Sequence, residues 1–473
     1  MIEDMQVRNL TPRTFWPTNE GPAKVFQALP GRFGGQRSPV ALRQRAERSL
    51  ADADHGHGSH IKIRITSLFC RPWRQRRMST SRRTLIQAAL AAAAAPPVPA
   101  SAAATPSFFD PWVEIHSGHL RHNVAEIHKR AGSRPILAVI KNNGYGMGVV
   151  NAARLLEPLA ALHALAVVKL DEAHKLRDAG IRKPILLMGP VDEHNLRDAL
   201  SRRITPMVYT PVGALLERLA ARGGRPVPVH ICIDTGIGRV GVPYTQAAGL
   251  IRDLASRRTV RIQGTMMTFT EDPAFDREQL RRFQAVCGEL GREGIEPGAR
   301  HAASSYALFQ HPDSFLDMVR PGMAVYGVYP ESGFRTAGAL DLRPVIALRA
   351  RVAYVKQLRR GDSAGYNRAY IAKQDVWVAT IPTGHADGLP RQAARGARVR
   401  IQGELYPLIA TVSASHSIAE IGPQPRVAAG DPVTFFDWQE GSRPEDLARA
   451  CGASVYDLLM HLNPLLARRL VSG

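Results

Sequence analysis

The chain has 473 residues, of which 45% are hydrophobic and 22% charged, so it has the composition of a globular protein with room for two or three domains. This composition excludes a disulfide-built mini-protein, a collagen-like repeat and a wholly disordered polymer. The formal net charge is +21, and residues 1–104 carry 16 Lys and Arg against 6 Asp and Glu. The excess of Lys and Arg over Asp and Glu is therefore densest in the first fifth of the chain. It indicates solubility rather than function, and we expect no nucleic-acid partner.

The four cysteines are far apart in the sequence and form neither a CxxC motif nor a cluster with histidine. They are Cys70, Cys232, Cys287 and Cys451. This pattern indicates neither a structural zinc site nor a disulfide framework, and we expect no metal.

The N-terminal region divides at Met78. Residues 1–77 show no sustained helical or strand period and end in a basic run, so we predict a disordered extension upstream of the natural start. Residues 78–104 combine the pair Arg82-Arg83, an Ala-rich apolar run to Ala95 and a small-residue cleavage site. This combination predicts a twin-arginine-type signal peptide and a periplasmic location, or a cytoplasmic one if the signal is not used.

An Ala-rich linker or a buried helix is the alternative interpretation of residues 78–104. The apolar run is too short and too rich in alanine for a good membrane span, so we expect no stable membrane association.

From residue 105 to 340, short apolar runs alternate with amphipathic helical stretches. Strands are predicted at 135–140, 164–168, 184–188, 227–233, 261–264 and 318–326, and helices at 149–160 and 170–179. Continuously apolar strands alternating with helices imply a parallel sheet covered by helices. About eight such units fit into residues 112–335, and this number predicts a (β/α)8 TIM barrel.

Residues 341–473 have a different texture, with short strands separated by turn residues. Strands are predicted at 345–355, 376–381, 397–401 and 432–436, followed by helices at 444–451 and 455–462. This pattern predicts a C-terminal antiparallel β domain.

The segment AVIKNNGYGMG, residues 138–148, carries the strongest chemical signal. Lys141 ends a buried strand and precedes a Gly-rich loop, so in a barrel it lies at the C-terminal rim, where catalytic groups are found. An apolar rim removes solvent from the lysine, lowers its pKa and makes its amine nucleophilic, as Schiff-base chemistry requires. An ordinary surface lysine at a strand end is the alternative.

This segment resembles the cofactor-lysine motif of the alanine racemases, which are fold-type III enzymes that use pyridoxal 5′-phosphate (PLP). Four further segments resemble the same family in the same order, and together the five cover roughly residues 111–470. These four lie at 233–241, 301–305, 319–327, and 365–366 with 384–391.

The resemblance implies a two-base mechanism in a homodimer. Lys141 would bind PLP covalently and act as one acid–base group, and Tyr366 of the other subunit would act as the second. Racemisation removes a proton from one face of the carbanion and returns it to the other, so it needs two opposed groups. PLP supplies the electron sink.

The resemblance also implies the cofactor contacts. Arg320 would contact the pyridine nitrogen, and Arg239 would lie near the phenolic oxygen or the carboxylate of the amino-acid substrate. The phosphate would be held by Tyr145, Ser305 and the backbone of Gly322 and Met323, and His301 belongs to the same cofactor site.

Each of these residues also has a purely structural interpretation. Arg239 and Arg320 could form ordinary ion pairs, Tyr366 could be a packed aromatic, and Ser305 a helix cap. A strand-end histidine such as His301 often only hydrogen-bonds its neighbours.

Several positions depart from the family pattern. Thr268 replaces the histidine that usually stacks over the cofactor, Cys232 a lysine that is often carbamylated, and His385 a tyrosine. Ala414 stands in the substrate-carboxylate segment, where it replaces a larger side chain and should enlarge the substrate pocket. The C-terminal tyrosine that often binds phosphate aligns loosely with Asn463 or Pro464.

The leading prediction is PLP-dependent racemisation of L-alanine to D-alanine. One alternative is a broad-specificity periplasmic amino-acid racemase, and a second is a PLP-binding protein with little or no turnover. A fold-type III decarboxylase or aldolase fits less well, because of the Tyr366 segment and because no metal-ligand set is visible.

Overall fold

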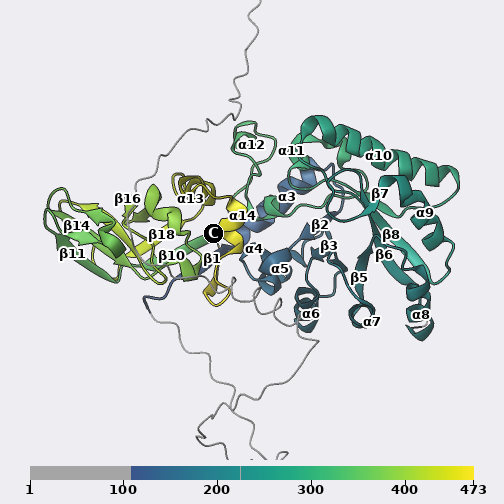
Figure 1. Cartoon of the computed structure of the whole chain (residues 1–473), viewed down its shortest axis with the longest axis horizontal. Coiled ribbons are helices and arrows are strands. Elements are labelled where there is room, and N and C mark those ends of the chain that lie inside the picture. The colour runs from purple at the N-terminus through teal and green to yellow at the C-terminus, as the bar shows by residue number, and fades with distance from the viewer. Residues whose placement is uncertain (1–107, 224, 473) are drawn as a thin grey trace, which may run out of the picture. The chain divides into compact units, whose positions relative to one another are not determined.

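A computed structural model describes residues 108–223 and 225–472 (Figure 1). The predicted extension at 1–77 and the predicted signal peptide at 78–104 lie outside these residues. Within the described range, none of the helices combines the length and the hydropathy that a bilayer span requires.

The first large element is a curled parallel sheet, as predicted. Its strands pair in chain order, with the short β7 (Val242–Pro243) added beside β6. The predicted strands at 135–140, 164–168, 184–188, 227–233 and 261–264 are all confirmed, with ends that shift by a few residues. The path runs through β2 (Ile136–Val139), β3 (Leu162–Val167), β4 (Ile185–Leu187), β5 (Ile204–Val208), β6 (Val227–Asp234), β8 (Val260–Met266) and β9 (Ala299–His301).

The barrel closes through an irregular segment rather than a full eighth strand. The prediction of a strand over 318–326 was wrong, because only Val319 pairs, in a parallel bridge with Ile136. The Leu137 amide donates to the Val319 carbonyl at 2.9 Å, and the Val139 amide donates to the Pro321 carbonyl at 2.8 Å. Pro321 has no amide to continue the ladder, and the chain then forms a 3-10 helix over Met323–Tyr326.

Helices cover the outside of the barrel (Figure 1). In α5 (Val149–Leu156) the buried residues Val149, Ala152, Ala153 and Leu156 follow the i, i+3, i+4, i+7 spacing of one helix face. The helix was predicted to reach residue 160, but it ends before Pro158, which cannot continue a helix. The other main helices are α3 (Ser117–Arg130), α6 (Leu170–Asp178), α7 (Glu193–Ser201), α8 (Gly213–Gly223), α9 (Tyr244–Ala255) and α10 (Pro273–Arg292).

The second large element is a nine-stranded sheet that contains β1 (Trp112–His116). Residues from 105 onward were assigned to the barrel, yet β1 pairs antiparallel with β10 (Ile346–Arg351) and parallel with β19 (Ala467–Val471). The strand that enters the barrel region therefore belongs to the sheet formed by the end of the chain.

The remaining strands of this sheet pair antiparallel, as predicted for the C-terminal domain. The prediction found β14 (Val376–Ile381), β15 (Arg398–Ile401), β18 (Pro432–Phe436) and α13 (Pro444–Cys451). It merged β10 with β11 (Tyr354–Leu358) and ended α14 (Val455–Met460) two residues late. It missed β16 (Glu404–Ile409), β17 (Ser417–Gly422) and β19.

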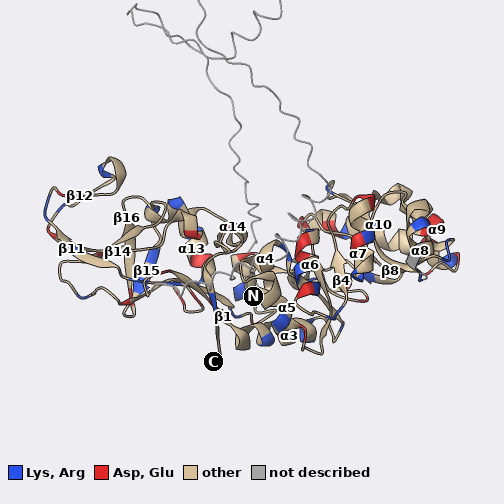
Figure 2. Cartoon of the chain, turned by 90° about the horizontal axis from the view of Figure 1, so that it is seen from below, with Lys and Arg blue, Asp and Glu red and all other residues tan. Residues whose placement is uncertain are grey.

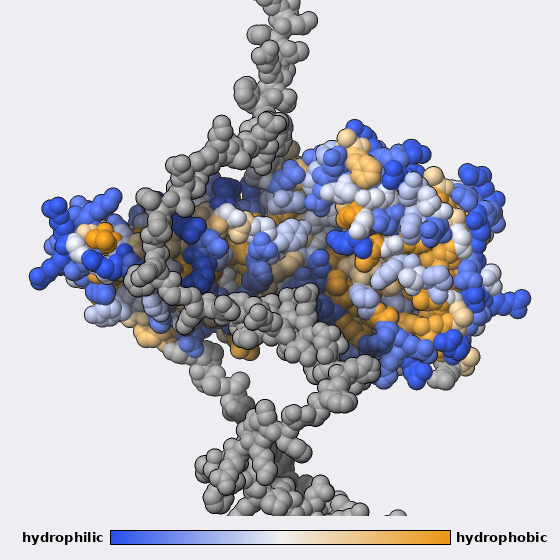
Figure 3. All heavy atoms as spheres, in the orientation of Figure 1, coloured by the Kyte–Doolittle hydropathy of each residue, from blue (hydrophilic) through white to orange (hydrophobic). Residues whose placement is uncertain are grey.

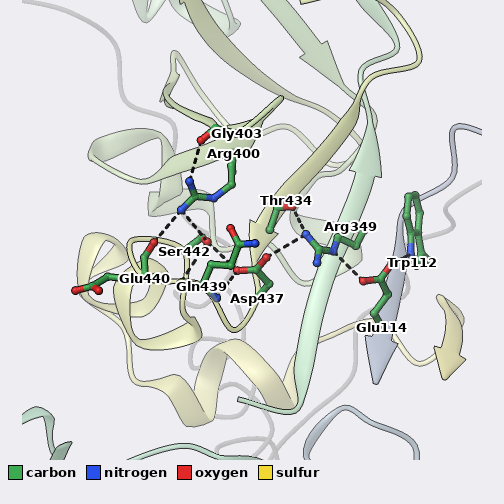
Figure 4. A network of polar contacts seen from close by, with 10 residues as sticks. All are labelled: Trp112, Glu114, Arg349, Arg400, Gly403, Thr434, Asp437, Gln439, Glu440 and Ser442. Carbon is green, nitrogen blue, oxygen red and sulfur yellow. Dashed lines mark hydrogen bonds and ion pairs between the residues drawn. The ribbon is translucent and has the colours of Figure 1, made fainter. Parts of the chain in front are cut away.

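A polar network joins β1 to the C-terminal strands (Figure 4). The Arg349 guanidinium of β10 donates to Glu114 of β1 at 2.9 Å and to Thr434 of β18, and lies 3.2 Å from the buried carboxylate of Asp437. Because all these groups are largely buried, removing one partner would leave an uncompensated charge.

Charges of both signs are interspersed on the outer helices. Blue and red residues both occur on α6 and α7 in Figure 2, and orange patches lie among blue ones on the barrel face in Figure 3. The described part of the chain carries several arginine–carboxylate pairs on these helices, such as Arg252 with Glu289 and Glu293.

Candidate active site

A cavity of about 610 Å³ lies at the C-terminal ends of the barrel strands. Seven of the residues that were predicted to bind cofactor or substrate line it, together with the substituted positions Cys232 and Thr268. The barrel therefore brings to one cavity side chains that are separated by up to about 180 positions in the sequence. The seven are Lys141, Tyr145, Arg239, Ser305, Arg320, Gly322 and Met323.

Lys141 begins a short turn that follows β2 directly. Asn142, Asn143, Gly144 and Tyr145 all have positive φ, between 51° and 59°, so α4 (Lys141–Tyr145) is left-handed after its first residue. Asparagine and glycine tolerate this conformation best, which accounts for the Asn-Asn-Gly sequence.

The buried side chain of Glu172 holds this turn. Its carboxylate accepts hydrogen bonds from the Asn143 amide at 2.7 Å and from the Lys169 amide at 3.3 Å. A carboxylate at the start of α6 thereby fixes the loop that carries Lys141.

The Lys141 amine lies in a partly desolvated, positively charged environment. Burial is the main cause that lowers its pKa, and the nearby guanidinium groups of Arg239 and Arg320 add to the effect. A lowered pKa increases the fraction of neutral amine, which is the form that attacks a carbonyl.

Tyr145 and Gly322 form a narrow end of the cavity. The Tyr145 ring is buried and packs against Tyr326, with ring centroids 4.9 Å apart. A Cβ at Gly322 would lie 2.4 Å from the Tyr145 hydroxyl, so only glycine fits here. The Ser305 hydroxyl accepts hydrogen bonds from the Gly322 and Ala324 amides, at 3.0 and 3.1 Å.

Ser304 contributes a hydroxyl that is buried and has no hydrogen-bond partner in the described part of the chain, although it lines the cavity. A buried polar atom without a partner is costly. This end of the cavity therefore offers an unused polar group to a bound anion.

Arg320 is held by neighbours on β9 and in the segment that follows β8. Its guanidinium donates to the Met267 carbonyl at 2.9 Å, to the Thr268 hydroxyl at 3.3 Å, and to both the carbonyl and Nδ1 of His301. Burial lowers the pKa of Arg320 to about 10, so it remains charged at neutral pH. Thr268, which replaces the expected histidine, thus contacts Arg320.

His301 lies behind Arg320 rather than in the cavity. Its Nδ1 accepts from Arg320 at 3.1 Å, so its Nε2 carries the proton and donates to His230 Nδ1 at 2.9 Å. Burial lowers the pKa of both imidazoles, that of His230 to about 4. Neutral His301 positions Arg320 and has no direct access to a ligand in the cavity.

Arg239 and Cys232 form another wall. The Arg239 side chain has no hydrogen bond or ion pair with any described residue, and the Cys232 thiol donates weakly to the Val240 carbonyl at 3.5 Å. Burial raises the pKa of Cys232 to about 11, so the thiol stays neutral. Arg239 is therefore available to a carboxylate or a phenolate.

The candidate residues of the C-terminal domain lie elsewhere. Tyr366 is 72% exposed, and neither it nor His385 nor Ala414 lines the cavity that contains Lys141. His385 and Ala414 are neighbours, since the Ala386 amide donates to the Ala414 carbonyl at 3.0 Å and a Cβ at Gly384 would lie 2.2 Å from that carbonyl oxygen.

Sequence reasoning missed four residues that shape the cavity or its walls: Glu172, Glu271, Ser304 and Tyr456. The signal for Glu172 was its position at the start of a helix directly after a strand. The ring of Tyr456, on α14, lies 6.3 Å from the ring of Tyr145. Asn463, which aligns with the expected phosphate-binding tyrosine, instead donates to the Ala386 carbonyl at 3.0 Å.

The cavity fits PLP in the chemistry of its walls. The same space is lined by the Lys141 amine, whose lowered pKa suits the aldehyde, and by the serine hydroxyls at 304 and 305, which suit the phosphate. The fixed guanidinium of Arg320 lines it too and suits the ring nitrogen. Because Gly322 has no Cβ, the Tyr145 hydroxyl can approach its backbone closely at the phosphate end of the cavity.

Comparison with known proteins agrees with this description. The profile of the alanine racemase N-terminal domain matches residues 115–330, and that of the alanine racemase C-terminal domain matches residues 345–470. The chain is 33% identical to alanine racemase of Desulforamulus reducens over 355 residues, which covers 74% of this chain and 95% of that protein. It is 34% identical to alanine racemase of Desulfovibrio desulfuricans, with 69% and 88% covered.

Solved structures show the same fold. Alanine racemase from Streptomyces lavendulae superposes with a TM-score of 0.73 at 29% identity, and covers 78% of this chain and 98% of that one. Alanine racemase from Bacillus anthracis with bound L-Ala-P superposes with a TM-score of 0.70 at 28% identity, with 78% and 96% covered.

Proposed function

This chain belongs to the alanine racemase family, and from that premise we propose that Lys141 and Tyr366 are the two acid–base groups with which it racemises its substrate. The enzyme is a PLP-dependent alanine racemase that interconverts L- and D-alanine. The observation that carries the assignment of residues is the position of Lys141. Its desolvated amine shares one cavity with Arg239 and Arg320, at the rim where barrel enzymes bind their substrates.

PLP, when bound, withdraws electrons from the substrate α-carbon and so acidifies the α-proton. Lys141 would hold its aldehyde carbon, and Ser304, Ser305 and Tyr145 its phosphate. Arg320 donates to four groups already and keeps its own proton, so it leaves the ring nitrogen unprotonated. That arrangement favours proton exchange over reactions that need a stronger electron sink.

The proton transfers follow from two opposed groups. Lys141 Nζ removes or returns the α-proton on one face of the substrate, and Tyr366 Oη does so on the other. Arg239, which has no partner among the described residues, is available to orient the substrate carboxylate.

We assign Tyr366 to the partner's site because of where it lies. Its side chain is 72% exposed and outside the Lys141 cavity of its own subunit, and it sits on a turn where Asn367 and Arg368 have positive φ. An exposed tyrosine next to a strained turn of the C-terminal domain suits a homodimer with shared sites.

A wider substrate range is the second candidate. Thr268 is a small side chain in the cavity wall, and Ala414 lies beside His385 on the C-terminal domain. If the partner subunit supplies Ala414 to the mouth, larger amino acids would fit. We further propose export to the periplasm, supported by the Arg82-Arg83 pair and the apolar run that follows.

The test uses the full chain, purified with PLP and incubated in D2O with L-alanine and a panel of larger L-amino acids. Proton NMR follows the loss of each α-proton signal. Exchange on alanine alone indicates a dedicated alanine racemase, and exchange across the panel indicates broad specificity. Bound PLP without exchange on any substrate would contradict the proposed function and favour a PLP-binding protein.

Location is tested separately by expression of the full chain and of an Arg82→Lys, Arg83→Lys variant. Racemase activity in the periplasmic fraction, lost in the variant, would support twin-arginine export. Activity that stays with the cytoplasm in both would contradict it.

A further inference from the structure

Glu271 is an acidic residue in a cavity whose other charged groups are mainly basic. It lines the same space as Lys141, Arg239 and Arg320, at the solvent-exposed mouth, in the loop between β8 and α10. The cavity therefore has a basic group at its buried end, Arg320, and another at its exposed rim, Arg239, and Glu271 adds a negative charge at that rim.

The loop that carries Glu271 is firmly held. The fully buried carboxylate of Asp276 accepts hydrogen bonds from the amide of Thr270 at 3.1 Å, the hydroxyl of Thr270 at 2.9 Å and the amide of Glu271 at 3.1 Å. Its other oxygen lies 3.0 Å from Nε2 of His311. The Thr270 amide also donates to Gln279 at 2.8 Å.

These bonds keep Glu271 in an unusual conformation. Its φ is +68°, a region that side-chain-bearing residues rarely adopt. A glycine would adopt it freely, so the glutamate is maintained against a backbone cost. The clamp by Asp276 fixes the direction in which the Glu271 carboxylate leaves the chain.

The Glu271 carboxylate has no hydrogen bond or ion pair with any residue in the described part of the chain. Burial is the main cause that raises its pKa, and the nearby carboxylates of Asp276 and Glu331 add to the effect. A raised pKa means that the charged form is destabilised in the absence of a counter-ion. A cation bound in the cavity would supply that counter-ion.

We propose that Glu271 selects amino acids with a cationic side chain, so that this enzyme racemises basic amino acids of the lysine class in addition to alanine. The α-carboxylate would face Arg239 and the side-chain ammonium would face Glu271 at the mouth. This inference rests on the proposed function, because it takes the Lys141 cavity as the site of racemisation.

The experiment compares L-lysine with L-norleucine, which has the same carbon chain and no ammonium group. The full-length holoenzyme and its Glu271→Gln variant are assayed for both and for L-alanine. We expect kcat/KM for lysine to fall by about tenfold in the variant, through KM, since one partly desolvated ion pair is lost. Values for norleucine and alanine should change by less than about twofold. Glu296→Gln, an exposed glutamate outside the cavity, is the matched control.

Binding provides a readout that does not depend on turnover. Calorimetric titration of the Lys141→Ala variant should show tighter binding of lysine than of norleucine. The double variant Lys141→Ala, Glu271→Gln should bind the two equally. The inference is overturned if lysine is neither bound nor turned over while alanine is exchanged. It is also overturned if Glu271→Gln lowers kcat/KM equally for all substrates. Equal losses with a weaker dimer would assign Glu271 to a subunit contact instead. If alanine exchange also fails, the proposed function fails, and the titrations alone decide whether Glu271 binds a cation.

Discussion

At the scale of single residues, environment rather than residue type distinguishes Lys141 from the other lysines. Lys175 is exposed and pairs with Asp171 at 3.0 Å, which suits a charged ammonium. Lys141 is half-buried among guanidinium groups, which suits a neutral amine. The same side chain therefore serves solubility at one position and chemistry at the other.

Replacing Lys141 by alanine should abolish covalent attachment of PLP, because no other lysine among the described residues lines the cavity. Borohydride reduction followed by peptide mass analysis would detect the link in the wild type and none in the variant. Racemisation should fall by about a thousandfold or more, as for loss of a nucleophile with acid–base function. PLP still covalently attached in Lys141→Ala would contradict the assignment. Lys175→Ala is the control.

At the scale of elements, the end of the chain supports the turn that carries Lys141. Arg468 on β19 donates to the Gly146 carbonyl at 2.9 Å, and to the carbonyls of Asn463 and Pro464 at 2.8 and 2.9 Å. A Cβ at Gly146 would lie 2.1 Å from the Leu459 carbonyl oxygen, so α14 packs against the backbone of this turn. The C-terminal segment thus holds the left-handed turn in place.

Substituting Arg468 with methionine should destabilise the protein by about 2 kcal/mol, because three carbonyls, two of them in partly buried hydrogen bonds, lose their charged donor. It should also lower kcat more than it raises KM, since Lys141 loses its fixed position. Chemical denaturation, steady-state kinetics and the absorbance of bound PLP measure these effects. Arg468→Lys keeps the charge and should restore only part of the loss, and Arg449→Met, at an exposed arginine, should change little. Unchanged kcat and absorbance in Arg468→Met would rule out this positioning role.

At the scale of the whole molecule, the arrangement of the site predicts that one subunit is incomplete. Lys141 lies in the barrel cavity, and Tyr366 lies exposed on the C-terminal domain outside it. Burial of an exposed aromatic against a second copy is a common way to complete a site in a symmetric dimer.

Mixing inactive Lys141→Ala with inactive Tyr366→Ala subunits should restore activity. If the sites are shared, a mixed dimer contains one intact site and one site that lacks both groups, so an equal mixture recovers about one quarter of the wild-type sites. Racemase assays after subunit exchange, with unmixed variants as controls, measure this recovery. No recovery, in the presence of proven mixed dimers, would place Tyr366 in its own subunit's site.

Elements whose signal lies within a short stretch of chain could be predicted from the sequence. Apolar strands such as β2, β3 and β6 and amphipathic helices such as α5 and α13 were predicted because their side-chain periods are encoded within a dozen residues. Lys141 was recognised for the same reason, since a strand, a lysine and a Gly-rich turn are contiguous.

Features that depend on distant partners became visible only in the folded chain. The pairing of β1 with the C-terminal sheet could not be predicted, because its partners, β10 and β19, lie more than 200 residues away in the sequence. Val319 closed the barrel in place of a regular strand, because Pro321 cannot extend the ladder. The sequence also did not predict the contacts of Glu172 with the Lys141 turn or the position of Glu271 in the cavity. A short sequence window encodes period and propensity, whereas pairing, burial and charge environment arise only when distant segments meet.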